Sequence, residues 1–411
     1  MNEGSNMVAK NACWPGYLRK NGRKGIRNKL LILYTVECAS FVAKEIGRLT
    51  ASPHVDVVGF AGCTDNEYAV RLLIALIRHP NVGGVLVVGL GCEYIQPKWL
   101  ATIAEEEGKL ASWLFIQQTG GTEKSIKKGT KLAAAFLQEL QKTPQTSMYI
   151  TDLVLGAECG GSDYTSGLAG NAVVGRLFNR LVSIGGTALF EEILETIGLL
   201  ELLQKRGANK KAKQQIEATY YKALQYCNST RQYSISPGNF AGGLSTIEEK
   251  SMGAVIKSGT QPIQGVLKVA QNPPGKGLWL LDTTPDPHWM QFGIANPNDN
   301  EGLLALAASG CQLLLMVTGR GNVVGSAVAP VLKITGNHNT YLHMQGDMDF
   351  DAGLALTGQK TLAELEKDLL EMVLNVAIGK PTKSETLGHK EYHIPYKYQT
   401  PGGSKAGCAQ Q

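Results

Sequence analysis

The 411-residue chain lacks long apolar runs, blocks of like charge and a leader-like start. Its apolar stretch at 311–317 is far shorter than the roughly 20 residues that cross a bilayer, so we expect no membrane span. Lys and Arg number 40 against 35 Asp and Glu, spread along the chain, which argues against nucleic-acid and membrane-surface partners. Residues 1–13 carry no apolar segment like that of a signal peptide, so we expect a cytoplasmic protein.

Cysteine is also scarce, with eight residues in the whole chain. That is too few for the disulfide framework of a small secreted protein. In a reducing compartment, thiols act in catalysis or bind metal more often than they form bridges. The position of each cysteine relative to the predicted strands is therefore informative.

Glycine, by contrast, is abundant, with 48 of 411 residues. This share is about 12%, against a usual share of about 7%, and it has no collagen period. We therefore expect the excess in turns that need positive φ or that let the backbone approach a ligand closely.

Short β-branched runs alternate with amphipathic stretches, a pattern typical of α/β proteins. Their continuous apolar character favours parallel strands that are covered on both faces. The predicted strands are 30–36, 55–60, 84–89, 153–156, 277–282, 312–317 and 331–334. Helical periodicity marks 39–49, 65–78, 99–107, 121–140 and 362–377, and a helix–strand–helix unit is predicted at 177–198. We expect an α/β fold with a doubly wound, mostly parallel sheet domain followed by a second, smaller α/β unit.

The predicted organisation has four parts. They are an N-terminal tail at 1–15, a first α/β domain with strand-end cysteines at 16–230, a second α/β domain at 231–390 and a polar, frayed C-terminal tail at 391–411. The Lys-rich stretch 200–230 is interpreted as a solvated helical connector, with nucleic-acid binding as a minor alternative.

Four cysteines lie just past the ends of predicted strands: Cys38, Cys63, Cys92 and Cys159. The carboxyl ends of parallel strands face one crevice, so these residues could converge there. Three thiolates with one open position would suit iron, zinc or an iron–sulfur cluster. The alternative is that small buried cysteines simply fit tight turns, most of all for Cys38. The remaining cysteines show no such context and are treated as incidental.

The motif Glu158-Cys159-Gly160-Gly161-Ser162-Asp163, continued by Ser166, is a second candidate site. The backbone N–H groups of paired glycines can approach an anion, and the Ser162 hydroxyl can add a donor. The carboxylates of Glu158 and Asp163 suit metal binding or proton transfer. The alternative is a Gly-rich turn with an Asp cap. The chain has neither a P-loop nor a clean G-x-G-x-x-G, so nucleotide binding is disfavoured.

A third candidate, Thr318-Gly319-Arg320-Gly321, directly follows a predicted strand. Its arginine could clamp a carboxylate or sulfonate, or it could tie down its own loop. Asp282 also ends a strand, and Asp347 and Asp349 lie two residues apart. These aspartates are possible ligands or bases, although exposed loop acids are common. Glu192 and Glu195 are predicted to lie on a solvated helix face.

Together these motifs resemble the altronate/galactarate dehydratase family, which includes the large subunit of sulfolactate sulfo-lyase. The resemblance extends over nearly the whole chain. It rests on GYLRKNGRKGIRN at 16–28, HPNVGGVLVVGLGCEYIQ at 79–96, QTGGT at 118–122, ECGGSDYTSGLAGN at 158–171, SPGNFAGGLSTIEEKSMG at 236–253, TGRG at 318–321, GDMDFDAG at 346–353 and KSETLGHKE at 383–391.

The resemblance implies a metal-dependent hydro-lyase that acts on a sugar-derived hydroxy acid such as an aldonate or aldarate. The reaction would abstract the proton α to the carboxylate, and a bound metal would stabilise the resulting enediolate. The alternatives are sulfite elimination from sulfolactate by a carbon–sulfur lyase, and a non-catalytic paralogue that binds a metabolite. The implied cofactor is Fe²⁺ or another divalent metal, or else a [4Fe–4S] cluster on Cys63, Cys92 and Cys159.

The working assignment of roles follows from these motifs. The catalytic residues are Glu158, Ser162 and Asp163. The metal ligands are Cys63, Cys92, Glu93 and Cys159. The substrate-binding residues are Gly160, Gly161, Ser166, Asp282, Thr318, Gly319, Arg320, Gly321, Asp347 and Asp349.

Three departures from the family pattern bear on the substrate. Gly59 stands where the family often has His, Ala172 follows Asn171 in place of Pro, and Asp351 replaces Asn in the DMDFDAG motif. Family members also have a small N-terminal domain, either fused or supplied as a separate subunit. The residues before Gly16 cannot form it, so we expect a separately encoded small subunit and a homo- or hetero-oligomer.

Overall fold

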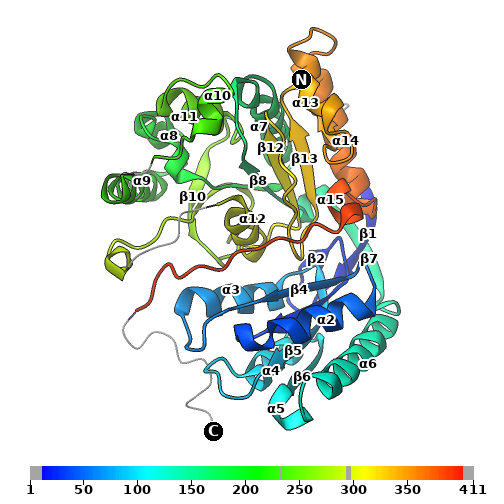
Figure 1. The fold of residues 1–411 in the computed structure, drawn as a ribbon. Coiled ribbons are helices and arrows are strands. Elements are labelled where there is room, and N and C mark those ends of the chain that lie inside the picture. The colour runs from blue at the N-terminus through cyan, green and yellow to red at the C-terminus, as the bar shows by residue number, and fades with distance from the viewer. Residues whose placement is uncertain (1–11, 232, 293–297, 401–411) are drawn as a thin grey trace.

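The computed structural model describes residues 12–231, 233–292 and 298–400, which form two parallel sheets and one small antiparallel sheet (Figure 1). The fold class predicted from the sequence, α/β with parallel sheets, is confirmed. Among the described residues, no helix combines the length and apolar character that a membrane crossing needs.

The first sheet has four parallel strands in the order β4-β3-β5-β6. Its central strand β3 (Lys29–Tyr34) lies between β4 (Val55–Gly59) and β5 (Val82–Gly89), and β6 (Leu110–Phe115) is the outer neighbour of β5. Every residue of β3 and β5 is buried, as expected for strands covered on both faces. The prediction missed β6 because its sequence, LASWLF, is half-exposed and lacks β-branched residues.

Helices cover both faces of this first sheet. On one face lie α2 (Ser40–Thr50) and α6 (Thr122–Leu140), and on the other α3 (Glu67–Arg78) and α4 (Pro97–Glu106). These four helices closely match the ranges expected from the 3.6-residue period. The short helix α5 (Ile116–Thr119) follows β6.

The second sheet has seven parallel strands in the order β10-β11-β9-β8-β12-β13-β14. They are β8 (Val154–Cys159), β9 (Thr187–Phe190), β10 (Ile263–Lys268), β11 (Gly277–Asp282), β12 (Leu313–Thr318), β13 (Val331–Thr335) and β14 (Phe350–Asp351). The sheet expected to be the smaller one is therefore the larger. The boundary expected at residue 230 falls between β9 and β11, which pair directly.

The second sheet is also covered on both faces. The helices α7 (Asn171–Ser183) and α14 (Leu362–Ile378) cover one face. The other face carries α12 (Asp299–Ala308), which packs in one apolar core with α3 of the first unit. The remaining helices are α8 (Leu200–Lys205), α9 (Lys210–Thr230), α10 (Pro237–Ala241), α11 (Ile247–Ile256), α13 (His338–His343) and α15 (Lys383–Leu387).

The Lys-rich segment expected to be a solvated connector is part of the second unit. Its main helix, α9, buries Ile216, Ala223 and Tyr226 in the core around the second sheet. Most residues of this long helix are polar, and its apolar residues form a single stripe on one side. The overall composition therefore suggested a solvated helix although one side is buried.

An antiparallel sheet stands beside the two units, with β1 (Cys13–Leu18) between β2 (Lys24–Gly25) and β7 (Gln145–Tyr149). Residues from 12 onward are thus already part of the fold, although 1–15 were expected to be a tail. Residues 1–11 lie outside the described part of the chain.

The segment expected to be a frayed tail packs between the two units as far as residue 400 (Figure 1, red). Tyr396 stacks edge-on against Phe60, with ring centroids 5.3 Å apart, and Tyr398 stacks against Tyr68 at 5.1 Å. The ammonium of Lys397 pairs with Glu301 of α12. The prediction failed because this segment has no periodicity, and its aromatic residues pack singly. Residues 401–411 lie outside the described part.

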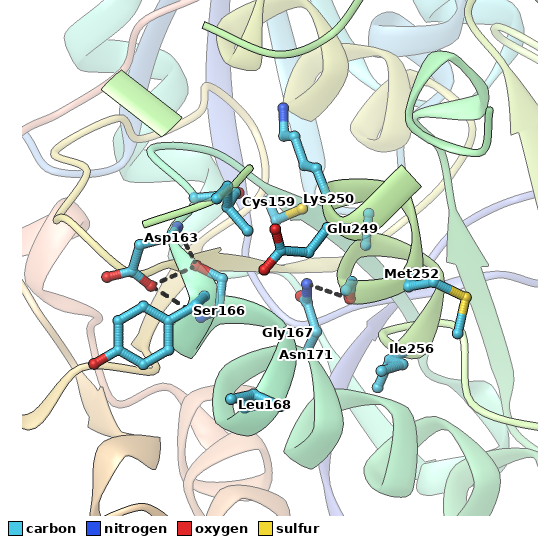
Figure 2. Close-up of a pocket in the computed structure, with 15 residues that line it drawn as sticks. Cys159, Asp163, Ser166, Gly167, Leu168, Asn171, Glu249, Lys250, Met252 and Ile256 are labelled. Atoms are coloured by element: carbon cyan, nitrogen blue, oxygen red, sulfur yellow. Dashed lines mark hydrogen bonds between the residues drawn. The ribbon is translucent and has the colours of Figure 1, made fainter. Parts of the chain in front are cut away.

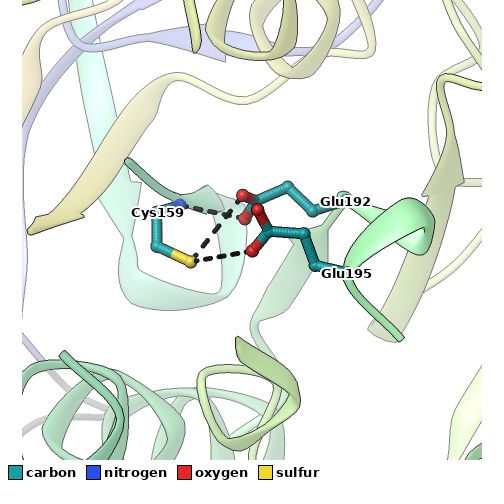
Figure 3. A group of neighbouring side chains, drawn as sticks. All are labelled: Cys159, Glu192 and Glu195. Atoms are coloured by element: carbon teal, nitrogen blue, oxygen red, sulfur yellow. Dashed lines mark hydrogen bonds between the residues drawn. The ribbon is translucent and has the colours of Figure 1, made fainter. Parts of the chain in front are cut away.

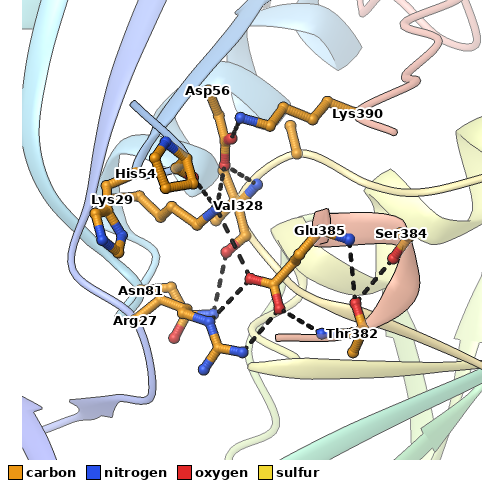
Figure 4. A network of polar contacts seen from close by, with 12 residues as sticks. Arg27, Lys29, His54, Asp56, Asn81, Val328, Thr382, Ser384, Glu385 and Lys390 are labelled. Atoms are coloured by element: carbon orange, nitrogen blue, oxygen red, sulfur yellow. Dashed lines mark hydrogen bonds and ion pairs between the residues drawn. The ribbon is translucent and has the colours of Figure 1, made fainter. Parts of the chain in front are cut away.

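A polar network also fastens the units together (Figure 4). The guanidinium of Arg27 donates to both carboxylate oxygens of Glu385, at 2.9 and 2.8 Å. Buried Asp56 pairs with Lys390 at 2.8 Å and accepts the Val328 N–H at 2.8 Å. Two of the sequence motifs, at 16–28 and 383–391, therefore meet at this contact between the units.

Candidate functional site

The second sheet has a topological switch point between β8 and β12. From β8 the chain continues to β9 on one side, whereas β12 lies on the other side and leads to β13. The helix after β8 and the helix before β12 cover opposite faces of the sheet. In such sheets, ligands bind outside the carboxyl ends of the strands at this point. The loops that leave β8 and β12 there carry the two Gly-rich motifs predicted as candidate sites.

The structure brings these two loops together. The carbonyl oxygen of Gly161 accepts the N–H groups of Gly319 and Arg320, at 3.3 and 3.0 Å. Gly161 has φ of 62°, in the left-handed region that favours glycine. The Thr318 hydroxyl accepts the Gly321 N–H at 3.0 Å. The two Gly-rich loops are therefore in direct contact.

Gly160 makes room for a carboxylate from α12. A Cβ at this position would lie 2.0 Å from Asp299 Oδ2 and 2.6 Å from Met316 Cε. Only glycine therefore lets Asp299, in the first turn of α12, reach the loop after β8. This carboxylate accepts a hydrogen bond from Asn322 Nδ2 at 2.6 Å.

Two cavities are lined by Cys159, and a third shares residues with one of them. The main cavity, of about 550 Å³, is lined by Cys159, Gly160, Gly161, Glu195, Tyr233, Ser234, Ile235, Ser236, Gly238, Asn239, Lys250, Asp299, Arg320 and Gly321. An apolar cavity of about 320 Å³ lies under α11, where Leu168, Met252 and Ile256 line it (Figure 2). An acidic cavity of about 70 Å³ is lined by Glu158, Glu191, Glu192, Glu195, Asp299 and Glu301, among others. Glu195 and Asp299 belong to both the main and the acidic cavity.

A thiol and two carboxylates form the centre of this region (Figure 3). The Cys159 Sγ lies 3.7 Å from Glu192 Oε1 and 3.5 Å from Glu195 Oε2. Among the described residues, this is the only group of three or more Cys, His, Asp or Glu whose potential ligand atoms all lie within 4.8 Å. Glu192 has φ of 67°, a left-handed conformation that costs a non-glycine residue about 1–3 kcal/mol. Strain of this kind is common at functional sites.

Two buried lysines balance these acids. Lys257, 1% exposed, contacts Cys159 Sγ at 3.2 Å and pairs with Glu192. Lys250 pairs with Glu195 at 2.5 Å. Burial would lower the pKa of Lys257, but the negative groups around it outweigh this and raise that pKa well above its usual value. Burial raises the pKa of the Cys159 thiol.

The acidic cavity holds more carboxylates than lysines. Burial, followed by the charges of Glu191 and Asp299, raises the pKa of Glu158 well above its usual value. Its Oε2 has no hydrogen-bond partner among the described residues, and Glu158 is 2% exposed. Burial also raises the pKa of Asp299 above its ordinary 3.8. Lys250 and Lys257 do not balance all of this negative charge, so the site can take up protons or a cation.

The prediction missed most of this cluster. Glu192 and Glu195 were expected on a solvated helix face, but Glu195 is 5% exposed and both carboxylates contact Cys159. The signal was present, because Glu191 and Glu192 directly follow β9, in the position that drew attention to the cysteines. Lys250, Lys257 and Asp299 gave no signal, since they follow no predicted strand.

Comparison with known families covers nearly the whole chain. Residues 16–141 match the family described as D-galactarate dehydratase/altronate hydrolase, second domain, and residues 150–400 match D-galactarate/altronate dehydratase, C-terminal. The chain belongs to the D-galactarate/altronate dehydratase family. The resemblance inferred from the motifs is confirmed, and this member of the family is a lyase.

Three relatives illustrate the range of the family. The altronate dehydratase of Bacillus subtilis (strain 168) is 32% identical, over 93% of this chain and 78% of its own. The (2R)-sulfolactate sulfo-lyase subunit beta of Chromohalobacter salexigens is 32% identical, over 96% of this chain and 100% of its own. The galactarate dehydratase (L-threo-forming) of Escherichia coli (strain K12) is 32% identical, over 76% of this chain and 59% of its own.

Within this family member, the residues of the ECGGSD motif differ in their surroundings. The Asp163 carboxylate accepts the N–H groups of Thr165 and Ser166, at 2.8 and 3.1 Å, and so caps its own turn. Ser166 Oγ accepts the Asp163 N–H at 3.1 Å (Figure 2). Ser162 lines the apolar cavity, and its buried Oγ has no hydrogen-bond partner among the described residues.

The predicted metal ligands Cys63, Cys92, Glu93 and Cys159 do not form one group. Cys63 and Cys92 are exposed at the carboxyl edge of the first sheet, whereas buried Cys159 ends β8 of the second sheet. The Glu93 carboxylate accepts the N–H groups of Leu90, Gly91 and Cys92 at 2.7–3.0 Å. The strands carry these residues into different sheets, which their spacing in the sequence did not reveal.

The three remaining aspartates lie outside the cavities described here. Asp282 pairs with Lys222 of α9 at 2.5 Å. Asp349 accepts the N–H groups of Lys333 and Lys383, at 2.8 and 2.9 Å. Asp347 and Asp349 precede β14, so they are not at the carboxyl end of that strand. Their assignment to substrate binding stays a prediction without support from this geometry.

Proposed function

We propose that this lyase eliminates water from a sugar-derived hydroxy acid, such as an aldonate or aldarate, bound in the main cavity. The observation that carries the proposal is the meeting of two Gly-rich loops, an arginine and a buried carboxylate–lysine cluster at one switch point. Relatives named altronate dehydratase and galactarate dehydratase support the same substrate class.

The substrate carboxylate would bind near Arg320. This side chain lines the main cavity, and its Nη1 donates to the Gly238 carbonyl at 2.7 Å. A guanidinium has five N–H donors in a planar fork, so several remain for a bidentate pair with a carboxylate. Lys250 lines the same cavity and adds a second positive charge there.

The elimination needs a base near the carbon α to the carboxylate. The α C–H bond breaks and its proton goes to the base. The C–O bond to the β-hydroxyl breaks, and the departing hydroxyl takes up one proton and leaves as water. The net loss from the substrate is therefore one H and one OH. The enol that remains tautomerises to a 2-keto acid. Asp299 is our candidate base, because it lines the main cavity and its raised pKa makes it more basic than an ordinary aspartate. Glu158, which lies behind it, could pass the proton on.

The other predicted catalytic residues keep distinct roles in this proposal. The unpartnered Ser162 hydroxyl could donate to a ligand atom that reaches the apolar cavity. Asp163 would act by holding the loop, since its carboxylate is occupied by backbone N–H groups of its own turn.

The cluster of Cys159, Glu192 and Glu195 fits a single divalent cation, and we propose ferrous iron there. One thiolate and two carboxylates within 4.8 Å of one another are suitable ligands in type and spacing. Next to them, Glu158 Oε2 has no hydrogen-bond partner among the described residues, and the pKa of Glu158 is raised by burial and by neighbouring acids. Both observations fit a surplus of negative charge that a cation would balance. Lys250 pairs with Glu195, and Lys257 contacts Cys159 Sγ and Glu192, so both ammonium groups would have to turn away. A bound cation would act as a Lewis acid on substrate oxygens.

Sulfite is the second candidate leaving group. The relative named (2R)-sulfolactate sulfo-lyase subunit beta aligns over its whole length with this chain. Its name, which calls it a subunit, also supports a separately encoded partner subunit for this chain. The sulfonate of such a substrate would suit the same arginine, since its oxygens match a guanidinium fork.

The test is a product assay on a panel of aldonates, aldarates and sulfolactate. The full chain would be purified anaerobically with ferrous iron, with and without its candidate small subunit, and 2-keto acid and sulfite would be measured. We expect 2-keto acid from at least one sugar acid, and loss of activity on chelation of the metal. Recovery on adding iron back would link the metal to the activity.

In the same assay, Arg320→Ala tests whether this arginine binds the substrate, and Arg48→Ala is its matched control. We expect its KM to rise at least tenfold, because a charge-assisted bidentate pair is worth about 1.5–3 kcal/mol. Arg48→Ala, whose side chain is exposed on α2, should behave as wild type. Absence of 2-keto acid from every compound, with both subunits and iron present, would contradict the proposed function. Sulfite and a 2-keto acid from sulfolactate, with no 2-keto acid from any sugar acid, would replace water by sulfite as the leaving group.

A further inference from the structure

Three exposed cysteines follow neighbouring strands of the first sheet, each at the same distance in sequence from residues that pair across the strands. Tyr34 at the end of β3 pairs in register with Gly59 of β4 and with Val88 of β5. Cys38, Cys63 and Cys92 each follow one of these three residues by four positions. All three thiols are exposed. Three adjacent parallel strands thus deliver one cysteine each to the same edge of the sheet.

That edge is the switch point of the first sheet. From β3 the chain passes to β4 on one side, and β5 lies on the other side. The helix α2, after β3, covers one face of the sheet, and α4, after β5, covers the other. A ligand of this sheet is therefore expected outside the ends of β3 and β5.

Hydrogen bonds tie the three cysteine loops to one another. The Glu37 N–H donates to the Ala61 carbonyl at 3.3 Å, which joins the loop of Cys38 to that of Cys63. The Tyr94 N–H donates to the Cys63 carbonyl at 3.0 Å, which joins the loop of Cys63 to that of Cys92. The three cysteines therefore belong to one connected surface.

Buried Glu93 holds the third loop in shape. Its carboxylate accepts three backbone N–H groups of this loop and the Thr35 hydroxyl, the last at 2.6 Å. This makes Glu93 a support for the Cys92 loop, because its oxygens have little capacity left for a metal. Support of this kind around a ligand loop is typical of metal sites.

We infer that Cys38, Cys63 and Cys92 form a three-thiolate site for a [4Fe–4S] cluster, separate from the cluster around Cys159. Two thiolates bound to one ion at 2.3 Å can be no more than about 4.6 Å apart. The three thiols are not within 4.8 Å of one another, so their spacing does not match a single ion. A four-iron cluster holds its thiolates farther apart, and three thiolates leave one iron open to an oxygen ligand. This assignment replaces Cys159 by Cys38 in the set expected from the sequence, and it does not depend on the lyase proposal.

The test measures iron and acid-labile sulfide in the full chain, purified anaerobically and reconstituted with ferrous iron and sulfide. We expect about four irons and four sulfides per chain, with the visible absorbance of a cluster and its electron paramagnetic resonance signal on reduction. Iron bound at Cys159 without sulfide would raise the iron content but not the sulfide content. The sulfide content therefore separates the two sites.

Single substitutions assign the ligands. Cys38→Ser, Cys63→Ser and Cys92→Ser should each lose most of the sulfide and absorbance, whereas Cys159→Ser and Cys13→Ser should keep both. Circular dichroism and the melting temperature would show that each exposed-cysteine variant folds. The inference fails if the reconstituted wild type holds no sulfide, or if it binds one zinc in place of a cluster. It also fails if Cys38→Ser keeps the cluster while Cys159→Ser loses it.

Discussion

At the scale of single residues, Asp299 shows how position sets chemistry. It occupies the first turn of α12, where the helix dipole favours a carboxylate. Burial works in the opposite direction and is the larger effect, so the pKa of Asp299 lies above its ordinary 3.8. The absent side chain of Gly160 then admits this carboxylate to the main cavity. The result is a carboxylate that lines the main cavity and is more basic than an ordinary aspartate.

We expect Asp299→Asn to lower kcat by about 10²–10⁴, the usual contribution of a positioned general base. In the wild type the active form is the carboxylate, so kcat/KM should fall as the pH falls through the raised pKa of Asp299. The acidic limb of the pH profile should disappear in the variant. Steady-state kinetics between acidic and neutral pH would measure both effects.

Asp368→Asn is the control for that substitution. This residue lies on α14 and forms a half-exposed pair with Lys360, so its loss should leave both kcat and the pH profile unchanged. If Asp299→Asn retained the wild-type kcat and acidic limb, another group would have to be the base. Glu195 would then be the next candidate, because it lines the same cavity.

Sequence reasoning at this scale identified the loops better than the chemical groups on them. The Gly-rich turns after β8 and β12 could be predicted, since their glycines follow clear apolar strands. Among the partners of Cys159, Glu192 carried a signal, since it follows β9 directly. Lys250 and Lys257 carried none, because they come from α11 and its C-terminal end. Contacts between such distant segments depend on strand order, which a single sequence does not state.

At the scale of elements, apolar runs were sufficient to find most of the buried strands. They did not show which strands pair with each other. The prediction placed β8 with the strands before it, whereas β8 pairs with β9 and β12 in the second sheet. This difference matters chemically, because it moves Cys159 from the edge shared by Cys63 and Cys92 into a separate buried site. Short edge strands such as β14, with two residues, gave no pattern at all.

At the scale of the whole molecule, the two sheet units are joined by a common apolar core and by ion pairs, among them the pair of Arg27 with Glu385. The side chain of Glu385 is 17% exposed and accepts both hydrogen bonds of the Arg27 fork. Burial would raise the pKa of Glu385, but the Arg27 hydrogen bonds and charge outweigh this and lower it. The segment that carries Glu385 leads into residues 389–400, which lie between the units.

We expect Glu385→Gln to lower the free energy of unfolding by about 3 kcal/mol at neutral pH, because it leaves the buried guanidinium of Arg27 without its counter-charge. A carboxyl whose folded pKa is lowered stabilises the protein above its ordinary pKa of 4.5. This stabilisation is lost as the pH falls through the folded pKa, so wild type and variant should converge in acid. Urea unfolding at several pH values would measure the difference.

Glu139→Gln is the matched control for Glu385→Gln. Glu139 pairs with Lys142 on the exposed side of α6, and exposed pairs of this kind contribute little to stability. Its substitution should leave the unfolding midpoint unchanged. Equal effects of Glu385→Gln and Glu139→Gln would show that the Arg27 pair does not hold the two units together.

The central claim, elimination that begins with loss of the α proton, is tested most directly by running the reaction in D₂O. The preferred substrate would be followed by ¹H NMR, with product sampled early and trapped before slow exchange. We predict that the α-proton signal disappears as a 2-keto acid forms, and that this product carries one solvent deuterium at C3 from ketonisation of the enol. A 2-keto acid that forms without deuterium at C3 would contradict the account.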